Sequence, residues 1–291
     1  MTAVADGTAG SLLNEAARDL GGAGIVQARL EARLLLCAAL SIDPADLVRD
    51  PARPVDPRET ARFRDWVARR RTRQPLAQIL GKREFWSLTF EVTGDTLDPR
   101  PDSETLIEAA VDLFPDRHAV SRILDFGAGS GCLLLAALVE FPAATGMGID
   151  AAAGAVTVAQ RNAARLGLAA RASFLHLPWE DFPGHADGVP ADLVLANPPY
   201  IPTGDIDALA PEVARYEPRL ALDGGADGLD AYRCLLPVVR DVVADAGRAI
   251  VEIGAGQSEA VTALAMAAGL RHVRGARDLG GHERALVFAR C

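Results

Sequence analysis

The chain of 291 residues has a net charge of −9 at pH 7, with 49% hydrophobic and 24% charged residues. These values are typical of a globular protein of about two domains and exclude disordered and fibrous chains. An acidic chain is also a poor candidate for nucleic-acid binding, which relies on Lys and Arg to neutralise phosphates.

Targeting and metal-binding signals are missing from the sequence. No apolar run approaches the roughly 18 residues of a membrane helix, and the N-terminal residues contain no apolar signal segment. The four cysteines are scattered, which predicts neither a disulfide framework nor a metal site. We therefore expect a cytoplasmic protein that binds no metal, no membrane and no nucleic acid directly.

The first 80 residues carry apolar side chains at helical spacing. Helices are predicted from residue 11 to the pair Gly21-Gly22, over 25–40, from Pro44 with Asp43 as its N-cap, and over 58–73. These helices predict a small N-terminal domain over residues 1–80.

The last of these helices is rich in arginine. Seven arginines stand against Glu59 and Asp65: Arg58, Arg62, Arg64, Arg69, Arg70, Arg71 and Arg73. One hypothesis is a patch for an acidic partner or RNA, and the other is an ordinary solvated helix face. The sequence leaves both hypotheses open.

Residues 85–92 combine aromatic and β-branched side chains, which is typical of a strand. Gly94-Asp95 follows and predicts a turn. We therefore expect a β-hairpin linker over 81–98 and a second domain over 99–291. The second domain is predicted to begin with a helix over 103–114, capped by Asp102.

Strands and helices alternate from residue 123 to the end. Strands are predicted at 123–126, 146–150, 172–175, 191–196, 248–253 and 284–290, with helices at 131–140, before Gly167, at 229–243 and at 258–268. This alternation predicts an α/β fold with a Rossmann-like, mostly parallel sheet and helices on both faces.

A glycine-rich loop, Asp125-Phe126-Gly127-Ala128-Gly129-Ser130-Gly131, joins the first of these strands to its helix. Ligands bind at the carboxyl ends of strands in such sheets, and glycines let the backbone approach them closely. Cys132 replaces the third glycine of the dinucleotide fingerprint. Asp150 ends the next strand, where a carboxylate can accept both hydroxyls of a ribose. Ribose binding without basic residues for phosphate favours S-adenosylmethionine over a dinucleotide.

Asn197-Pro198-Pro199-Tyr200 follows the strand over 191–196. The two prolines fix φ and lack N–H donors, so the loop is rigid and its carbonyls remain acceptors. The side-chain oxygen of Asn197 is a further acceptor. Two such acceptors can hold both N–H bonds of a planar NH₂ group and aim its lone pair at an electrophile, while Tyr200 offers a flat face.

Together these motifs resemble the release-factor glutamine methyltransferase family (PrmC, or HemK) of the class I S-adenosylmethionine-dependent methyltransferases. Further segments that carry the resemblance are residues 74–81, 84–86, 99–104, 217–225, 251–254 and 277–281. The resemblance covers the chain after about residue 70, and the helical N-terminal part fits in length and pattern.

The resemblance implies methylation of the side-chain amide of the glutamine in the Gly-Gly-Gln loop of class I peptide-chain release factors. The N-terminal domain is then a substrate-recognition domain. The implied S-adenosylmethionine-binding residues are Gly127, Ala128, Gly129, Ser130, Gly131, Asp150, Trp179 and Asn197. The implied substrate-binding residues are Asn197, Pro198, Pro199 and Tyr200, of which Asn197, Pro198 and Tyr200 are catalytic.

The entrance loop around Pro99-Arg100-Pro101 departs from the family in one respect. Asp98 stands where many relatives carry an apolar residue, and we expect it to alter this loop without touching the catalytic roles. Arg100 and Glu104 either shape the substrate entrance or form structural ion pairs, and the sequence does not choose between these hypotheses.

Three alternative functions share part of the pattern. DNA and RNA amino-methyltransferases need a basic target-recognition region, whereas the 91 residues after Tyr200 are required to complete the sheet. A non-catalytic S-adenosylmethionine-binding module does not need the intact Asn197 and Tyr200. A ribosomal-protein glutamine methyltransferase, which belongs to a closely related family, stays open as an alternative.

Overall fold

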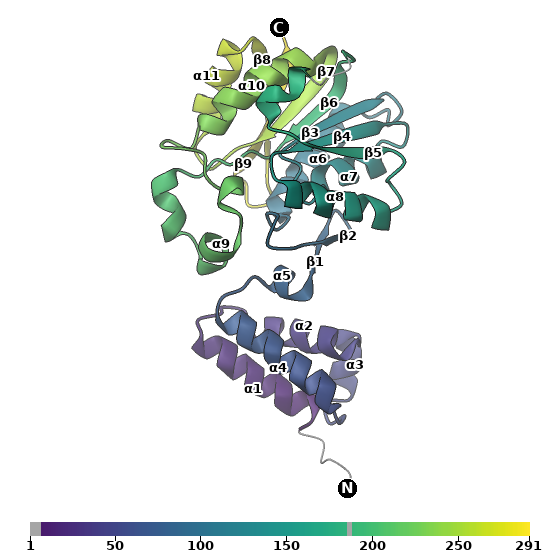
Figure 1. Cartoon of the computed structure of the whole chain (residues 1–291), viewed down its shortest axis with the longest axis vertical. Helices are drawn as coiled ribbons and strands as arrows, with labels where there is room; N and C mark the ends of the chain where they lie inside the picture. Colours follow the sequence, from purple (N-terminus) through teal and green to yellow (C-terminus); the bar gives the residue numbers. More distant parts are fainter. Residues whose placement is uncertain (1–6, 185–187) are drawn as a thin grey trace. The chain divides into compact units, whose positions relative to one another are not determined.

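The computed structural model describes residues 7–184 and 188–291, and the chain forms two compact units (Figure 1). The first unit contains Met1–Gly81 and Pro211–Tyr216, and the second contains Lys82–Ala210 and Glu217–Cys291. Within the described ranges, no helix combines the length and the apolar character that crossing a bilayer requires.

The first unit is helical, as the spacing predicts. Its helices are α1 (Ala9–Gly22), α2 (Ala28–Leu40), α3 (Pro44–Arg49), α4 (Pro57–Arg71), α5 (Leu76–Leu80) and α9 (Pro211–Tyr216). Leu12, Leu35 and Phe63, from three different helices, are each at most 2% exposed and lie in one core. The N-cap prediction for Asp43 is confirmed, because its carboxylate accepts from the Ala45 N–H at 2.8 Å.

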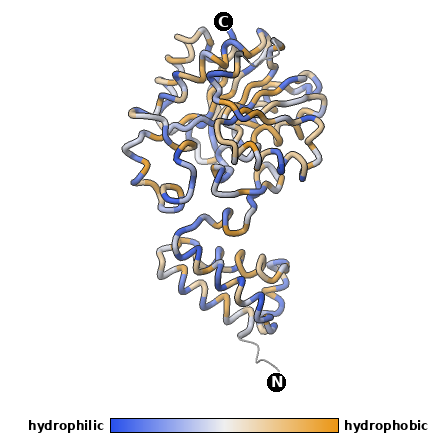
Figure 2. The backbone as a smooth tube through the Cα atoms, in the orientation of Figure 1, coloured by the Kyte–Doolittle hydropathy of each residue, from blue (hydrophilic) through white to orange (hydrophobic). Residues whose placement is uncertain are grey.

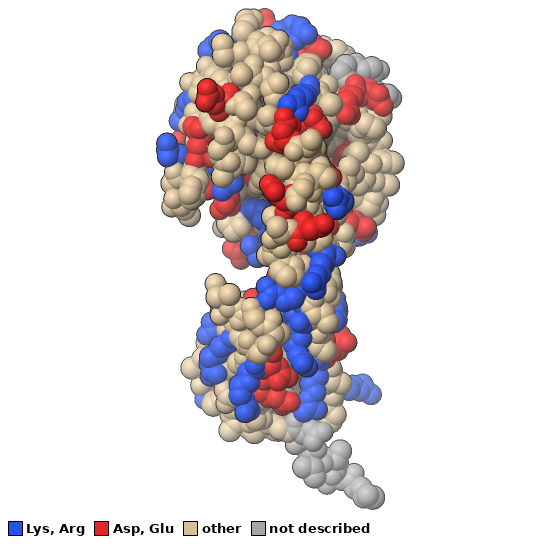
Figure 3. All heavy atoms as spheres, turned by 90° about the vertical axis from the view of Figure 1, so that its left-hand side faces the viewer, with Lys and Arg blue, Asp and Glu red and all other residues tan. Residues whose placement is uncertain are grey.

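Arginine side chains are dense on the visible face of the first unit (Figure 3). Two of the seven in the predicted patch form ion pairs with carboxylates outside α4 and therefore have a structural role. Arg70 is 5% exposed, is bonded to Glu31, and its Nη2 lies 2.9 Å from Glu212 Oε1. Arg73 Nη2 lies 2.9 Å from Glu212 Oε2. Glu212 belongs to α9, so these ion pairs hold α9 within the first unit.

The second unit begins with an antiparallel hairpin, β1 (Lys82–Phe85) and β2 (Leu88–Glu91). The hairpin is present and the turn expected at Gly94-Asp95 is confirmed, but the single strand expected over 85–92 is wrong. The chain turns at Trp86 and Ser87, whose φ angles are 52° and 58°. Non-glycine residues rarely adopt this conformation, so composition gives no signal for it. The Trp86 N–H donates to Glu104 Oε1 at 2.7 Å, which holds the turn.

The central sheet of the second unit has the strand order β5-β4-β3-β6-β7-β9-β8. Its strands are β3 (Arg122–Phe126), β4 (Thr145–Asp150), β5 (Ala172–His176), β6 (Ala191–Ala196), β7 (Val243–Glu252), β8 (Leu270–Arg277) and β9 (Glu283–Arg290). The first five in this order are parallel, and β9 is antiparallel to both neighbours. The mostly parallel fold is therefore confirmed. Edge strand β8 escapes prediction because its side chains are largely exposed.

Helices cover both faces of this sheet (Figure 1). They are α6 (Glu104–Leu113), α7 (Cys132–Glu140), α8 (Ala153–Arg165), α10 (Asp230–Val242) and α11 (Ser258–Ala267). Neighbouring strand residues point to opposite faces, so Ile123 packs in the cluster with α6 and α7, whereas Leu124 packs in the cluster with α10 and α11. Figure 2 shows the strands as largely hydrophobic, as burial on both faces requires.

The start of α6 differs from the prediction. Asp102 lies inside a short 3₁₀ turn, η1 (Pro101–Ser103), and among the described residues no side chain caps α6. The Asp102 carboxylate instead lies 3.2 Å from Arg284 Nη2. An ion pair from β9 therefore takes the carboxylate that the local sequence assigns to a cap.

Candidate active site

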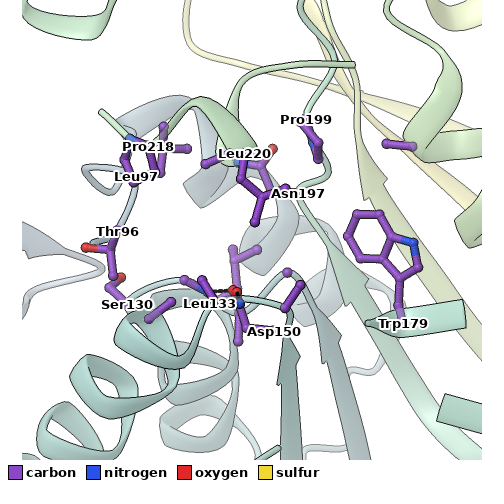
Figure 4. A pocket seen from close by; sticks show the side chains of 18 of the residues that line it. Thr96, Leu97, Ser130, Leu133, Asp150, Trp179, Asn197, Pro199, Pro218 and Leu220 are labelled. Atoms are coloured by element: carbon purple, nitrogen blue, oxygen red, sulfur yellow. Dashed lines mark hydrogen bonds between the residues drawn. The ribbon is translucent and has the colours of Figure 1, made fainter. Parts of the chain in front are cut away.

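A pocket of about 400 Å³ opens at the carboxyl ends of β3, β4 and β6. From β3 the chain first adds β4 and β5 on one side, and it then crosses to add β6 and β7 on the other side of β3. Ligands of such sheets bind at the point where the strand order reverses in this way. The volume lies within the roughly 300–1,000 Å³ of small-molecule sites. The predicted site residues that line it are Gly127, Ala128, Gly129, Ser130, Asp150, Trp179, Asn197 and Pro199. Figure 4 shows Asp150, Trp179 and Asn197 around one cavity.

Three predicted site residues are not among the described residues that line this pocket. Gly131 is the N-cap residue of α7, with a left-handed φ of 79°. Pro198 is buried in the loop after β6. The Tyr200 ring packs against the cluster formed with α10 and α11. The roles predicted for these three residues stay predictions.

Asp150 joins the glycine-rich loop to α8. Its Oδ2 accepts from the Gly129 N–H and its Oδ1 from the Ala152 N–H, both at 2.8 Å. Burial raises the pKa of Asp150, and the two backbone donors oppose that effect. Each carboxylate oxygen has room for a second donor. The residue therefore orders the loop and can still accept two ligand hydroxyls.

Gly127 and Trp179 form one wall of the pocket. Gly127 has a φ of 78°, and a Cβ built on it would lie 3.6 Å from the Trp179 ring. Glycine at 127 therefore keeps open the space between the loop and the indole. The buried Trp179 Nε1 has no hydrogen-bond partner among the described residues. The indole offers its flat apolar face to a planar heterocycle in the pocket.

Asp125, the first residue of the glycine-rich motif, is fully buried beneath the loop. Its Oδ2 accepts from the Leu134 N–H in α7 at 3.2 Å, and burial raises the pKa of Asp125 to about 7. The residue is a structural support of the loop, because it is 0% exposed and does not line the pocket.

Asp125→Asn removes this titration and keeps an acceptor for Leu134. An aspartate in an unfolded chain ionises near pH 3.9. Because the pKa of Asp125 is higher in the folded state, the buried carboxyl group lowers the stability of the folded protein progressively as pH rises from about 4 to about 7. Above about pH 7 this loss of stability has its full size. We expect the variant to unfold with a free energy up to about 4 kcal/mol larger than wild type near pH 8, and the difference to vanish near pH 4. Urea unfolding at both pH values measures it. A difference that does not change with pH would contradict this account.

Asn197 stands at the mouth of β6 with its amide fixed on one side. Its Nδ2 donates to Ser103 Oγ at 3.2 Å, and no donor from residues 7–184 or 188–291 is bonded to Oδ1, which is therefore available as an acceptor. The loop Asn197–Tyr200 is also held by Gln257, whose Nε2 donates to the Tyr200 carbonyl at 3.0 Å. Neither Ser103 nor Gln257 is identified by the motif analysis, although Ser103 lies in a segment that carries the family resemblance.

The entrance loop is held by ion pairs. Arg100, which lines the pocket, places Nη2 2.7 Å from both oxygens of the buried Glu217. Asp98 is 7% exposed and lies 3.8 Å from Arg83 Nε. Burial raises the pKa of Asp98, and the two arginines oppose that effect. Arg100 thus meets both hypotheses made for it, since it forms an ion pair and shapes the pocket wall.

Two family models match the sequence: the PrmC N-terminal domain over residues 11–81 and the methyltransferase small domain over residues 103–214. The release factor glutamine methyltransferase of Rhodospirillum rubrum is 47% identical over 97% of this chain and 85% of its own length. Those of Caulobacter vibrioides and Cereibacter sphaeroides are 46% and 45% identical, over 94% and 97% of this chain and 93% and 98% of their own lengths. A solved structure of the release-factor-specific protein-(glutamine-N5) methyltransferase from Alicyclobacillus acidocaldarius is 25% identical. It covers 69% of this chain and 99% of that one, with a TM-score of 0.42.

Proposed function

This chain belongs to the release factor glutamine methyltransferase family and is a protein-glutamine methyltransferase, and we propose that it transfers a methyl group from S-adenosylmethionine to the Gly-Gly-Gln glutamine of class I release factors. One observation carries the proposal. Asp150 and Trp179, which are suited to binding a nucleoside, line the same pocket as Asn197, which is suited to binding an amide.

The pocket fits S-adenosylmethionine on three grounds. Asp150 has a free acceptor position on each oxygen for the ribose hydroxyls. Trp179 lines the pocket and offers a flat apolar face to the adenine ring. Gly127 leaves the space that a Cβ would fill. When bound, S-adenosylmethionine supplies a sulfonium methyl group, which is a strong electrophile.

Asn197 Oδ1 and the Pro198 carbonyl would accept the two N–H bonds of the substrate glutamine, with Pro199 and Tyr200 completing the substrate site. An amide nitrogen is a poor nucleophile because its lone pair is delocalised, so alignment matters more than a base. Positioning can contribute up to roughly 7–11 kcal/mol. The same acceptors stabilise the positive charge that develops on the nitrogen during attack.

We also propose the domain roles. Residues 1–80 would recognise the substrate protein, residues 81–98 would link the domains, and residues 99–291 would carry the methyltransferase chemistry. The contact pattern supports a boundary close to Gly81, although it assigns the hairpin to the second unit.

Mass spectrometry tests the proposed reaction directly. The protein is incubated with S-adenosylmethionine and the release factor of its own organism, and a gain of one methyl group is expected on the Gly-Gly-Gln glutamine. A release factor with that glutamine replaced by alanine is the control and should stay unmodified. Binding of S-adenosylmethionine without methylation of the release factor would reject this substrate, and a methylated ribosomal protein would identify the alternative one.

A further inference from the structure

A chain of hydrogen bonds leads from Asn197 into the core of the second unit. Asn197 Nδ2 donates to Ser103 Oγ at 3.2 Å, and Ser103 Oγ donates to Glu252 Oε2 at 2.5 Å. Glu252, the last residue of β7, is 1% exposed. Its other oxygen, Oε1, accepts from Tyr200 Oη at 3.4 Å. Glu252 is therefore bonded directly to Tyr200, at one end of the loop that carries the proposed chemistry, and through Ser103 to Asn197, at the other end.

The charge of Glu252 determines which group donates and which accepts in this series of hydrogen bonds. An ionised carboxylate can only accept, so the Ser103 hydroxyl must point its proton at Glu252. The lone pairs of Ser103 Oγ are then left to accept from Asn197. An amide carries its two donors on nitrogen and its acceptors on oxygen, so only Nδ2 can face Ser103.

We propose that Glu252 is a positioning residue, which acts through Ser103 to hold the Asn197 amide with Oδ1 toward the substrate. The inference rests on the proposed function, because Oδ1 is the acceptor that the glutamine NH₂ requires. An Asn197 amide turned the other way would set an NH₂ group against the substrate NH₂ group. Two donors would then face each other, and the substrate nitrogen would lose its alignment.

Several groups around Glu252 favour or oppose its charge. Arg284 on β9 favours the ionised form, and Arg284 is itself held by Asp278 at 3.0 Å and by Asp102 at 3.2 Å. The charge of Asp102 opposes ionisation of Glu252, and the other ionisable groups near Glu252 among the described residues are Tyr200, Tyr232 on α10 and Cys132 on α7. Burial outweighs the favourable contacts and raises the pKa of Glu252 to about 7.

Protonation of Glu252 would allow the hydrogen bonds between Glu252, Ser103 and Asn197 to form in either donor–acceptor order. A neutral carboxyl group can donate to Ser103, which is then free to donate to Asn197 in turn. Because the folded-state pKa is raised, the fixed orientation is present above about pH 7 and is lost as pH falls through that value.

Kinetics with four variants test this role. We expect Glu252→Gln and Ser103→Ala to lower kcat for release-factor methylation by about tenfold, the effect of one well-placed hydrogen bond. The KM for S-adenosylmethionine should stay within about twofold. Ser103→Thr restores the hydroxyl and should restore kcat. Glu108→Gln, at an exposed position of α6 that does not line the pocket, is the matched control and should behave as wild type.

The pH profile separates positioning from a purely structural role. Wild-type kcat should fall below about pH 7, and this acid limb should disappear in Glu252→Gln. Asp125 has a pKa in the same range and is retained in the variant. Wild-type kcat and an unchanged acid limb in both Glu252→Gln and Ser103→Ala would overturn the proposal.

A direct view of the amide decides the question even if the release factor is not the substrate. The chain has three asparagines, Asn14, Asn162 and Asn197, so selective ¹⁵N-asparagine labelling gives a simple side-chain NMR spectrum. The Asn197 NH₂ resonance should shift with a midpoint near pH 7 in wild type and should not shift in Glu252→Gln. Asn14 and Asn162 serve as internal controls. An Asn197 signal that ignores both pH and substitution would reject the inference and leave the proposed function untouched.

Discussion

Asn197→Ala is expected to lower kcat for glutamine methylation by about 10²–10³-fold, the usual loss when one preorganised polar partner of a transition state is removed. The substitution deletes the Oδ1 acceptor and leaves the substrate NH₂ group free to rotate. Binding of S-adenosylmethionine should change far less, because Asp150 and Trp179 are intact. The fold should also persist, since Asn197 is only partly buried at the pocket wall.

Steady-state methylation of purified release factor measures this effect, with thermal unfolding to establish that the variant is folded. Asp245→Ala is the control, because Asp245 is 95% exposed, belongs to the second unit and does not line the pocket. Turnover close to wild type in folded Asn197→Ala would reject the role given to this side chain.

Asp150→Ala is expected to weaken S-adenosylmethionine binding by about 10²-fold. Hydrogen bonds to a charged group contribute roughly 1.5–3 kcal/mol each, and the variant loses two proposed bonds to the ribose. It also leaves the Gly129 N–H without its acceptor, so the glycine-rich loop is less ordered before the ligand arrives. Both effects act in the same direction on the dissociation constant.

Isothermal titration calorimetry with S-adenosylmethionine gives the dissociation constant of wild type and variant. Asp245→Ala makes the same substitution at a side chain that is 95% exposed and does not line the pocket. A wild-type dissociation constant in Asp150→Ala would mean that this carboxylate serves only the loop and α8.

The sequence predicts those parts of the site whose signals are local. The glycine-rich loop and the Asn197–Tyr200 loop each follow a short apolar strand directly, and the structure brings them to one pocket. The hydrogen bond between Ser103 and Glu252 joins residues that are 149 positions apart in the sequence, and no local sequence pattern predicts it. Asp102 fails as a predicted cap for the same reason, because the Arg284 that holds it comes from the last strand.

Local signals also fail where tertiary contacts stabilise an unfavourable backbone. The hairpin turn uses Trp86, a residue with strong strand propensity, at a positive φ. The hydrogen bond from its N–H to Glu104 offsets that cost. Strand β8 is missed for a different reason: its exposed positions at the sheet edge lack the apolar alternation that marks a buried strand.

The membership of α9 in the first unit has a consequence for the protein's modularity. The chain passes from one unit to the other after Gly81, after Ala210 and after Tyr216. Pro218, Leu220 and Ala221, just beyond the last crossing, line the pocket. Removal of residues 1–81 would therefore leave Glu212 without its ion pairs to Arg70 and Arg73. It would also remove the contacts that hold α9, which directly precedes the pocket-lining residues Pro218, Leu220 and Ala221. A domain on a single connection can be removed by one cut, whereas the two units of this chain are connected at three points and cannot be separated by one cut.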